Sequence, residues 1–257
     1  MPSIICKLLG AIEWKNNFPH SGDLASNVQV FKVNIPRNLI HVEKLTTLLN
    51  DTEIQRSERY HQVKDSQRYI ISRAVLKLLI GQYLQLPAAE ITIGIGVNKK
   101  PLISNKEAGR LQYNLTHAGE WILIAFSSTM VGIDLEYLDP HFDYQHLLPT
   151  CFNQTEQNAI LQSSNSRTQF YEYWTRKEAL VKATGKGIDE SLPLVPCMDG
   201  LSEIPFLMNG SEHWQVESFS IDEKHIATLA YPSTQKNILF IEQDVHSFID
   251  KIELIQA

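Results

Sequence analysis

The chain is predicted to fold as an α+β protein with two halves of similar plan, residues 1–129 and 130–257, and a ligand cleft between them. Three observations support this prediction. Residues 28–35, VQVFKVNI, alternate in polarity as a strand does, and residues 66–84 carry apolar side chains at the helical period. Short strand patterns follow, and then helices and strands appear a second time. Each half is expected to pack a small sheet with a long helix. The order of the predicted elements supports the two similar halves, although no repeat is visible residue by residue.

The first half begins with turn-forming residues, as in NNFPHSGD at 16–23, so loose structure is expected over the first 25 or so positions. One helix is then predicted over 41–60. The helix at 66–84 has six residues in the helical period: Ile70, Ile71, Ala74, Val75, Leu78 and Leu79. Strands or strand-turn segments are expected at 91–103, 111–117, 121–128 and 131–138, with a tight turn at 117–120, HAGE.

Helices return in the second half at 155–162 and again over the segment that ends at 188. Thr155 is expected to cap the first of them, Ser166 to cap the second, and Gly185 to end the second. Three strands should close the chain, at 214–221, 225–232 and 237–243.

The overall composition is that of a globular protein, with 43% hydrophobic and 20% charged residues. The net charge of −6 argues against a nucleic-acid-binding protein, which usually has a basic surplus. The three cysteines lack metal-ligand spacing, which favours free thiols in a reducing compartment. The N-terminal segment lacks the features of a signal peptide, and no apolar run approaches a membrane span. A cytoplasmic protein that binds neither membrane nor nucleic acid is therefore expected.

The segment FYEYWTRKEALVKATGKGI, residues 170–188, raises a question of function. Trp174, Glu178 and Lys182 are four residues apart, so they lie on one face of a helix, beside apolar side chains. An ordinary ion pair between Glu178 and Lys182 at the border of a core helix would explain this pattern. A catalytic role requires a second group of carboxylates facing the helix.

A second group of carboxylates is present in GIDLE, where Asp134 and Glu136 point to the same face of a strand. A solvated pair at a sheet edge is one interpretation. Together with Glu178 they make three carboxylates, a ligand set that suits Mg²⁺. Lys182 would then be a cation that faces the same phosphate.

Basic residues cluster in the first half of the chain. His117 lies at the end of a strand, and the other basic positions near it are Lys99, Lys100, Arg56, Arg68 and Arg73. The arginines could simply form the solvated face of a helix. They could equally bind phosphate, for which Arg and Lys provide suitable donors.

The combination and order of these motifs resemble the surfactin-type (Sfp-like) 4'-phosphopantetheinyl transferase family. GIDLE is followed by WTRKEALVKATGKG, with HAG upstream and a Lys-Pro before that, so the likeness runs from about Arg56 to about Ile188. The resemblance implies two α+β halves in a pseudo-twofold arrangement with coenzyme A in the cleft, and a monomer. It also implies an enzyme that moves phosphopantetheine from coenzyme A to a serine of an apo acyl or peptidyl carrier protein, releasing 3',5'-ADP.

The resemblance further implies roles for the residues of the second half. Asp134, Glu136 and Glu178 would hold Mg²⁺ against the pyrophosphate of coenzyme A. Glu178 would take the proton of the carrier serine, directly or through a water, and Lys182 would stabilise the departing 3',5'-ADP. Trp174 is expected to pack the helix against the sheet.

In the first half, the resemblance assigns the 3'-phosphate of coenzyme A to Arg68, Lys100 and His117, with a further phosphate contact from Arg56. Two positions depart from the family pattern. Lys99 stands where a Gly usually precedes Lys-Pro, and Glu53 stands at a position that is basic in some relatives.

Two alternatives to this enzyme remain at the level of the sequence. One is a module that binds coenzyme A or a carrier protein without catalysis. The other is a different Mg²⁺-dependent nucleotide enzyme, although the phosphate loop GxxxxGK[ST] is missing.

Overall fold

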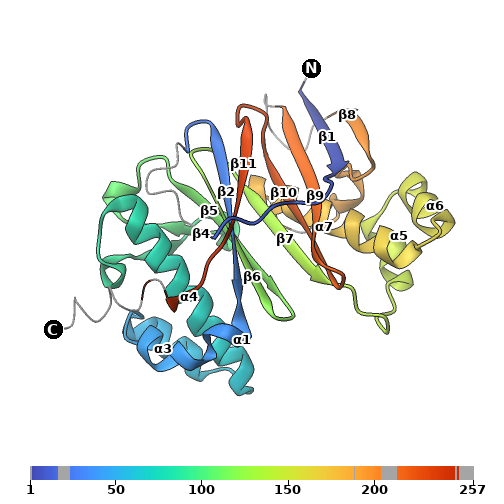
Figure 1. Ribbon diagram of the computed structural model, residues 1–257. Coiled ribbons are helices and arrows are strands. Elements are labelled where there is room, and N and C mark those ends of the chain that lie inside the picture. The colour runs from blue at the N-terminus through green and yellow to red at the C-terminus, as the bar shows by residue number, and fades with distance from the viewer. Residues whose placement is uncertain (1, 17–23, 188, 204–212, 247, 249–257) are drawn as a thin grey trace.

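The computed structural model describes residues 2–16, 24–187, 189–203, 213–246 and 248. Two sheets stand side by side in the middle of the molecule (Figure 1). The first has the order β11-β2-β6-β5, and its strands are β2 (Asn27–Asn34), β5 (Gln112–Ala118), β6 (Trp121–Ser127) and β11 (Asn237–Glu242). The second has the order β7-β10-β9-β1-β8, and its strands are β1 (Ser3–Leu8), β7 (Gly132–Tyr137), β8 (Gly200–Glu203), β9 (Trp214–Asp222) and β10 (His225–Pro232).

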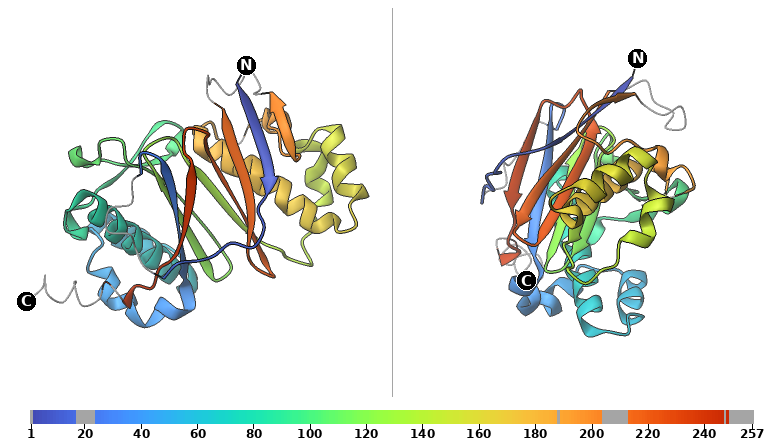
Figure 2. Two further views of the ribbon diagram at one scale, coloured as in Figure 1. Left: turned by 45° about the horizontal axis from the view of Figure 1, so that its top comes forward. Right: turned by 90° about the vertical axis from the view of Figure 1, so that its right-hand side faces the viewer.

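Each sheet is packed with one long helix, α4 (Val63–Leu84) or α7 (Ser166–Thr184). Both figures place the strands between α4 on one side and α5 to α7 on the other (Figures 1 and 2). The shorter helices are α1 (Ile35–Asn38), α2 (Val42–Thr46), α3 (Asp51–Glu58), α5 (Leu148–Cys151) and α6 (Gln154–Gln162). Short 3-10 helices cover Leu39–His41, Ala88–Glu90, Val97–Lys99, Lys106–Ala108, Gln145–Leu147 and Leu192–Leu194.

The two halves share one plan, which confirms the predicted fold class. In the first half, β2 precedes α4 and pairs with β6, the second strand of the hairpin β5–β6. In the second half, β7 precedes α7 and pairs with β10, the second strand of the hairpin β9–β10. All of these pairs are antiparallel, and the long helix separates the first strand from its hairpin in both halves.

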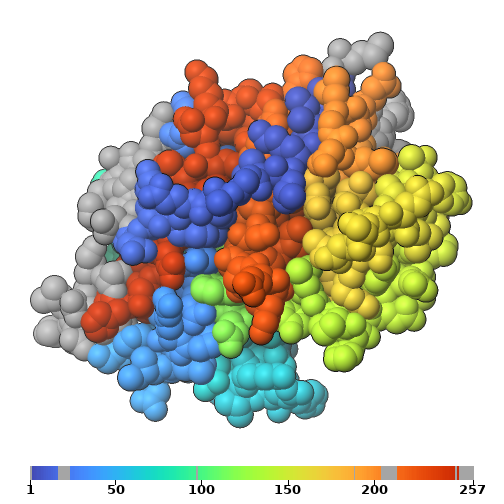
Figure 3. Space-filling view, turned by 45° about the vertical axis from the view of Figure 1, so that its right-hand side comes forward, coloured from blue at the N-terminus to red at the C-terminus, as the bar shows by residue number. Residues whose placement is uncertain are grey.

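The ends of the chain cross between the halves, which the sequence did not predict. The expectation of loose structure at the N-terminus is wrong for β1, which pairs with β8 and runs parallel to β9. At the other end, β11 runs parallel to β2. Lys15 and Ile241 form a bridge, and the N-terminal segment runs over the surface beside the C-terminal strands (Figure 3). Residues 17–23, which include most of NNFPHSGD, lie outside the described residues, and the boundary at 129 and 130 stays a prediction.

Apolar side chains form three cores. One lies between the first sheet and α4, and a second lies between the second sheet and the helices α5 to α7. The third joins the two sheets, because it takes buried side chains from both: Val28, Val30, Leu123, Ala125, Ile133, Leu135, Phe219, Ala227, Leu229 and Phe240. The faces of β2, β6, β7 and β10 that turn away from their own helices are thereby covered, so both sheets contribute buried apolar side chains on both faces.

The predicted helix over 41–60 is two helices, α2 and α3. Asn50 ends the run because its side chain accepts from Glu53 N while the Glu53 side chain accepts from Asn50 N, a capping box that starts α3. Asparagines also cap the later helices: Asn153 caps α6 and Asn165 caps α7, one or two residues before the predicted Thr155 and Ser166. Gly185 ends α7 with φ +69°, as predicted.

The segment at 91–103 is a short hairpin, β3 (Ile93–Ile95) and β4 (Pro101–Ile103), with a 3-10 turn over Val97–Lys99. The predicted tight turn in HAGE is confirmed, since Gly119 has φ +53° between β5 and β6. Within the described ranges, none of the helices has the length and apolarity required to cross a bilayer.

Candidate active site

Close packing of β7 on α7 creates the acidic part of the site. Gly132 makes this packing possible, because a Cβ atom at this position would lie 2.0 Å from Ala179 O and 2.4 Å from Ala183 N. A side chain here would push the strand away from the helix. Asp134, two residues further along β7, is thereby brought to the side chains that α7 directs at the strand.

Asp134 is the centre of this acidic cluster. It is 3% exposed, and its Oδ1 lies 2.5 Å from Lys182 Nζ. Thr116 Oγ1 of β5, from the other half, donates to the same oxygen over 3.4 Å. The second oxygen, Oδ2, is buried without a partner among the described residues. Burial raises the pKa of Asp134 although Lys182 opposes the shift.

Glu136 is held by the indole of Trp174, whose Nε1 donates to Glu136 Oε1 over 3.1 Å. Trp174 also stacks on Phe170 with 6.2 Å between the ring centroids, so it packs the helix, as expected, and orients a carboxylate as well. Burial, and then the charge of Asp134, raise the pKa of Glu136 to about 7.

Glu178 completes the cluster from α7. Its Oε1 is buried without a partner among the described residues, and its pKa is raised to about 7 by burial and then by Asp134. Three carboxylates therefore share a poorly solvated site in which Lys182 supplies one positive charge. Burial is the main cause of their raised pKa values, and for Glu136 and Glu178 the neighbouring charge of Asp134 adds to it.

The donor set fits a divalent cation in part. Asp134 Oδ2 and Glu178 Oε1 are buried acceptors without partners, and a hard cation such as Mg²⁺ binds one or two carboxylates and completes its shell with water and phosphate oxygens. Across the described residues, no group of three or more His, Cys, Asp or Glu side chains is arranged as a ready metal site. The carboxylates fit Mg²⁺ in chemistry, while a three-ligand geometry is not preformed.

A basic pocket of ≈ 210 Å³ lies next to this cluster, between α4 and β5. Arg56, Arg68 and His117 all line it, so the structure brings together three of the four residues predicted to bind phosphate. Burial, and then the charge of Arg68, lower the pKa of His117. Asp65 also lines the pocket and lies 2.9 Å from Arg68 through Oδ1 and Nη2.

The strand β5 joins the pocket to the carboxylates. Asn114 lines the pocket and accepts from Ile133 N of β7 over 3.0 Å, and Thr116 reaches Asp134. His117 is close enough to Lys182 for that charge to lower its pKa further. The described lining residues of the pocket lie between Arg56 and His117, so they come from the first half, and the carboxylates come from the second.

The structure does not bring Lys100 to this pocket. Its Nζ donates to Ala183 O over 2.9 Å, at the C-terminal end of α7, where a cation is favourable. Burial lowers the pKa of Lys100. A nearby amide, Asn98 Nδ2, donates to Gly185 O over 2.8 Å, so this loop is attached to the end of α7. A phosphate contact by Lys100 stays a prediction.

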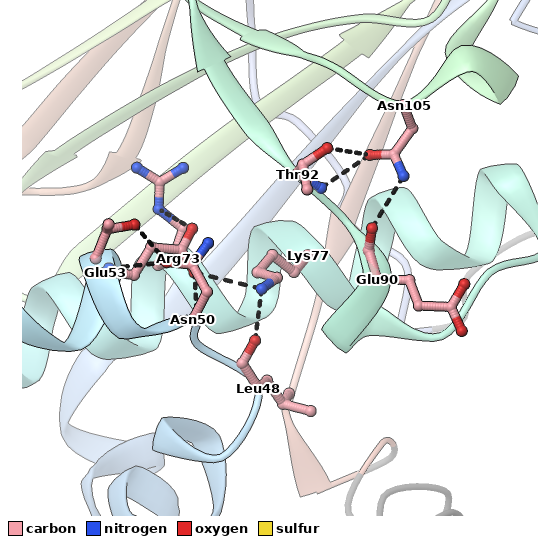
Figure 4. Close-up of polar contacts among 9 residues, drawn as sticks. Leu48, Asn50, Glu53, Arg73, Lys77, Glu90, Thr92 and Asn105 are labelled. Carbon is pink, nitrogen blue, oxygen red and sulfur yellow. Dashed lines mark hydrogen bonds and ion pairs between the residues drawn. The ribbon is translucent and has the colours of Figure 1, made fainter.

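Glu53, the departure noted in the sequence, has a structural role (Figure 4). It caps α3 and accepts from Lys77 Nζ over 3.3 Å, and its other oxygen lies 3.5 Å from Arg73 Nε. Lys77 also donates to Leu48 O over 2.6 Å. A basic residue at this position would leave Lys77 buried without its carboxylate, which explains the acidic side chain here.

Sequence reasoning missed Gly132, Thr116 and Asp65. Gly132 was visible as the first letter of GIDLE, but only the packing of α7 shows why a side chain is excluded. Thr116 and Asp65 belong to no motif in the sequence. Thr116 joins the site by its contact with Asp134, and Asp65 joins it by its contact with Arg68.

Comparison with known proteins gives matches in both halves of the chain. A sequence model described as 4'-phosphopantetheinyl transferase superfamily matches residues 130–230, and one described as 4'-phosphopantetheinyl transferase, N-terminal, matches residues 39–129. A putative 4'-phosphopantetheinyl transferase of Synechocystis sp. is 31% identical over 66% of this chain and 72% of its own length.

Two further relatives are similar in extent. The 4'-phosphopantetheinyl transferase HetI of Nostoc sp. is 29% identical over 68% of this chain and 76% of its own length. The 4'-phosphopantetheinyl transferase Sfp of Bacillus subtilis is 27% identical over 59% of this chain and 66% of its own length. With the site described above, these matches show that the chain belongs to the Sfp-type 4'-phosphopantetheinyl transferase family.

Proposed function

We propose that this transferase moves the 4'-phosphopantetheine arm of coenzyme A to a serine of an apo acyl or peptidyl carrier protein, with Mg²⁺ held by Asp134, Glu136 and Glu178. The observation that carries the proposal is the buried carboxylate cluster, in which Asp134 Oδ2 and Glu178 Oε1 lack partners among the described residues. The basic pocket beside it suits the other end of the same donor.

Phosphoryl transfer depends chiefly on positioning and on stabilisation of charge. Mg²⁺ bound by the carboxylates would neutralise the pyrophosphate of coenzyme A. Glu178 accepts the serine proton, directly or through a water. The serine oxygen then forms a bond to the β-phosphorus, and the bond from that phosphorus to 3',5'-ADP breaks.

Lys182 is the cation best placed to stabilise the departing 3',5'-ADP. Asp134 holds its ammonium group at the carboxylate cluster. The charge of Lys182 also acts on His117 in the basic pocket, where it contributes to lowering the pKa of that imidazole after burial and Arg68. At the far end of the donor, Arg56, Arg68 and His117 bind the 3'-phosphate through charge-assisted hydrogen bonds.

Mass spectrometry of an apo carrier protein tests the proposal. Incubation with the chain, Mg²⁺ and coenzyme A should add the mass of one phosphopantetheine arm, and EDTA should abolish the gain. A panel of apo acyl and peptidyl carriers covers the choice of partner. Binding of coenzyme A without any mass gain on the panel would contradict the proposal and leave a binding module.

A further inference from the structure

The basic pocket contains an unexpected negative charge. Of the described residues that line it, Asp65 alone carries a carboxylate, among three arginines and His117. A carboxylate close to a bound phosphate raises the free energy of the complex through like-charge repulsion. A second ligand group that donates a hydrogen bond would offset this cost.

The contacts of Asp65 place its carboxylate inside the pocket. Asp65 Oδ1 lies 2.9 Å from Arg68 Nη2, and Asp65 lines the same pocket as Arg68 and His117, the predicted phosphate ligands. The side chains of Asp65 and Arg68 are 27% and 29% exposed, so a ligand can reach both.

The carboxylate of Asp65 contributes only a little to the stability of α4. Asp65 lies in the first turn of the helix, where an acid is favourable, and its pair with Arg68 has the spacing i,i+3. Each effect is weak at an accessible position. An aspartate elsewhere in the first turn would serve the helix equally well without entering the pocket.

The chemistry of coenzyme A supplies the missing donor. Its ribose carries the 3'-phosphate and a free 2'-hydroxyl on neighbouring carbons, so a pocket for the phosphate also faces the hydroxyl. Carboxylates accept hydrogen bonds from ribose hydroxyls in dinucleotide-binding folds. We infer that Asp65 is the acceptor for the ribose 2'-hydroxyl, and that Arg68 bridges Asp65 and the 3'-phosphate. This inference rests on the proposed function of the pocket.

Calorimetric titration with 3',5'-ADP and with its 2'-deoxy analogue tests the inference without depending on transfer. Wild type should bind 3',5'-ADP about tenfold more tightly than the 2'-deoxy analogue, because only the first has the hydroxyl. Asp65→Ala should lose about tenfold for 3',5'-ADP and little for the analogue, so that the two bind alike. Asp51→Ala, an exposed first-turn aspartate of α3 outside the pocket, is the matched control and should keep the wild-type ratio.

Several results would overturn the inference. Equal binding of both ligands by wild type would mean that the hydroxyl is not recognised. If Asp65→Ala loses the same affinity for both ligands, Asp65 only orients Arg68. If Asp65→Ala binds both ligands more tightly, Asp65 only repels the phosphate. The proposed function fails separately, if wild type binds 3',5'-ADP but transfers nothing from coenzyme A to any carrier. Absence of binding to 3',5'-ADP would contradict both.

Discussion

At the scale of single residues, the partner of Lys182 decides between two interpretations of α7. The spacing of four residues left open a simple ion pair with Glu178. The structure instead joins Lys182 Nζ to Asp134 Oδ1 of β7 at 2.5 Å, while Glu178 keeps a buried oxygen without a partner in the described part of the chain. Lys182 therefore belongs to the carboxylate cluster rather than to the surface of its helix.

Replacing Lys182 by Met should affect both stability and turnover. The buried Asp134 loses its only cationic partner within the described residues, which we expect to cost about 1–3 kcal/mol of unfolding free energy in EDTA. The rate of transfer in Mg²⁺ should fall by roughly tenfold or more as the charge facing 3',5'-ADP is lost. Lys224→Met, in the exposed turn between β9 and β10, is the control for urea unfolding and mass-gain kinetics. Wild-type turnover in folded Lys182→Met would remove Lys182 from the mechanism.

The raised pKa of Glu178 should make the unfolding free energy depend on pH when no metal is bound. Its pKa of about 7 lies above its ordinary value of 4.5, so between these values the folded chain keeps a proton that the unfolded chain releases. Stability from this group is therefore full below about pH 4.5 and falls as the pH rises through 7. Glu178→Gln lacks this loss, so its stability relative to wild type should rise with pH by on the order of 2 kcal/mol. Urea titrations in EDTA from pH 5 to 8 measure the difference, and a difference independent of pH would contradict the shifted pKa.

At the scale of elements, local patterns predicted the long helices well and the connections poorly. The apolar period of 66–84 gave α4 within a few residues, because that signal lies within the helix itself. The break at Asn50 depends on a reciprocal cap with Glu53, and the strand β1 depends on partners some 200 residues away, such as Trp214 opposite Ile4. The cap of Asn50 with Glu53 is a local signal that the sequence analysis did not recognise, whereas the pairing of β1 is not visible in a local window of sequence.

The contact of β7 with α7 should not tolerate a methyl group. Gly132→Ala places a Cβ against the backbone atoms of Ala179 and Ala183, which cannot turn away as a side chain can. We expect a loss of about 3 kcal/mol in unfolding free energy. Gly10→Ala is the control, since nothing lies within 4 Å of an added Cβ there. Equal thermal midpoints for the two variants would contradict the close packing of strand and helix.

The loop before β4 should gain stability from the glycine that the family pattern has. Lys99 has φ +60°, a left-handed conformation that is unfavourable for a residue with a side chain, and it is exposed. Lys99→Gly should therefore stabilise the chain by about 0.5–1 kcal/mol. Lys106→Gly, in an exposed 3-10 helix without positive φ, should destabilise it. Chemical unfolding of both variants measures the sign, and a destabilised Lys99→Gly would mean that Lys99 makes contacts that offset its strain.

At the scale of the whole molecule, the site depends on the junction of the two sheets. Residue types and spacing, together with the resemblance to the family, pointed to the three carboxylates and to three of the residues that line the basic pocket. The pair of Asp134 with Lys182, the reach of Thr116 across the junction and the attachment of Lys100 to the end of α7 could not be predicted, since each joins segments distant in sequence. The exchange of β1 and β11 between the sheets joins the two halves again, at strands away from the contact of β5 with β7.

We propose that the cluster around Asp134 is the metal-dependent catalytic centre. The most direct test of this proposal is the rate at which an apo carrier protein gains the phosphopantetheine mass in Mg²⁺, compared between wild type and Asp134→Asn at equal helix content by circular dichroism. The substitution keeps the shape of the side chain and removes its charge, so the rate should fall by roughly a hundredfold or more. A folded Asp134→Asn variant that modifies the carrier at the wild-type rate would contradict the assignment of this cluster as the catalytic centre.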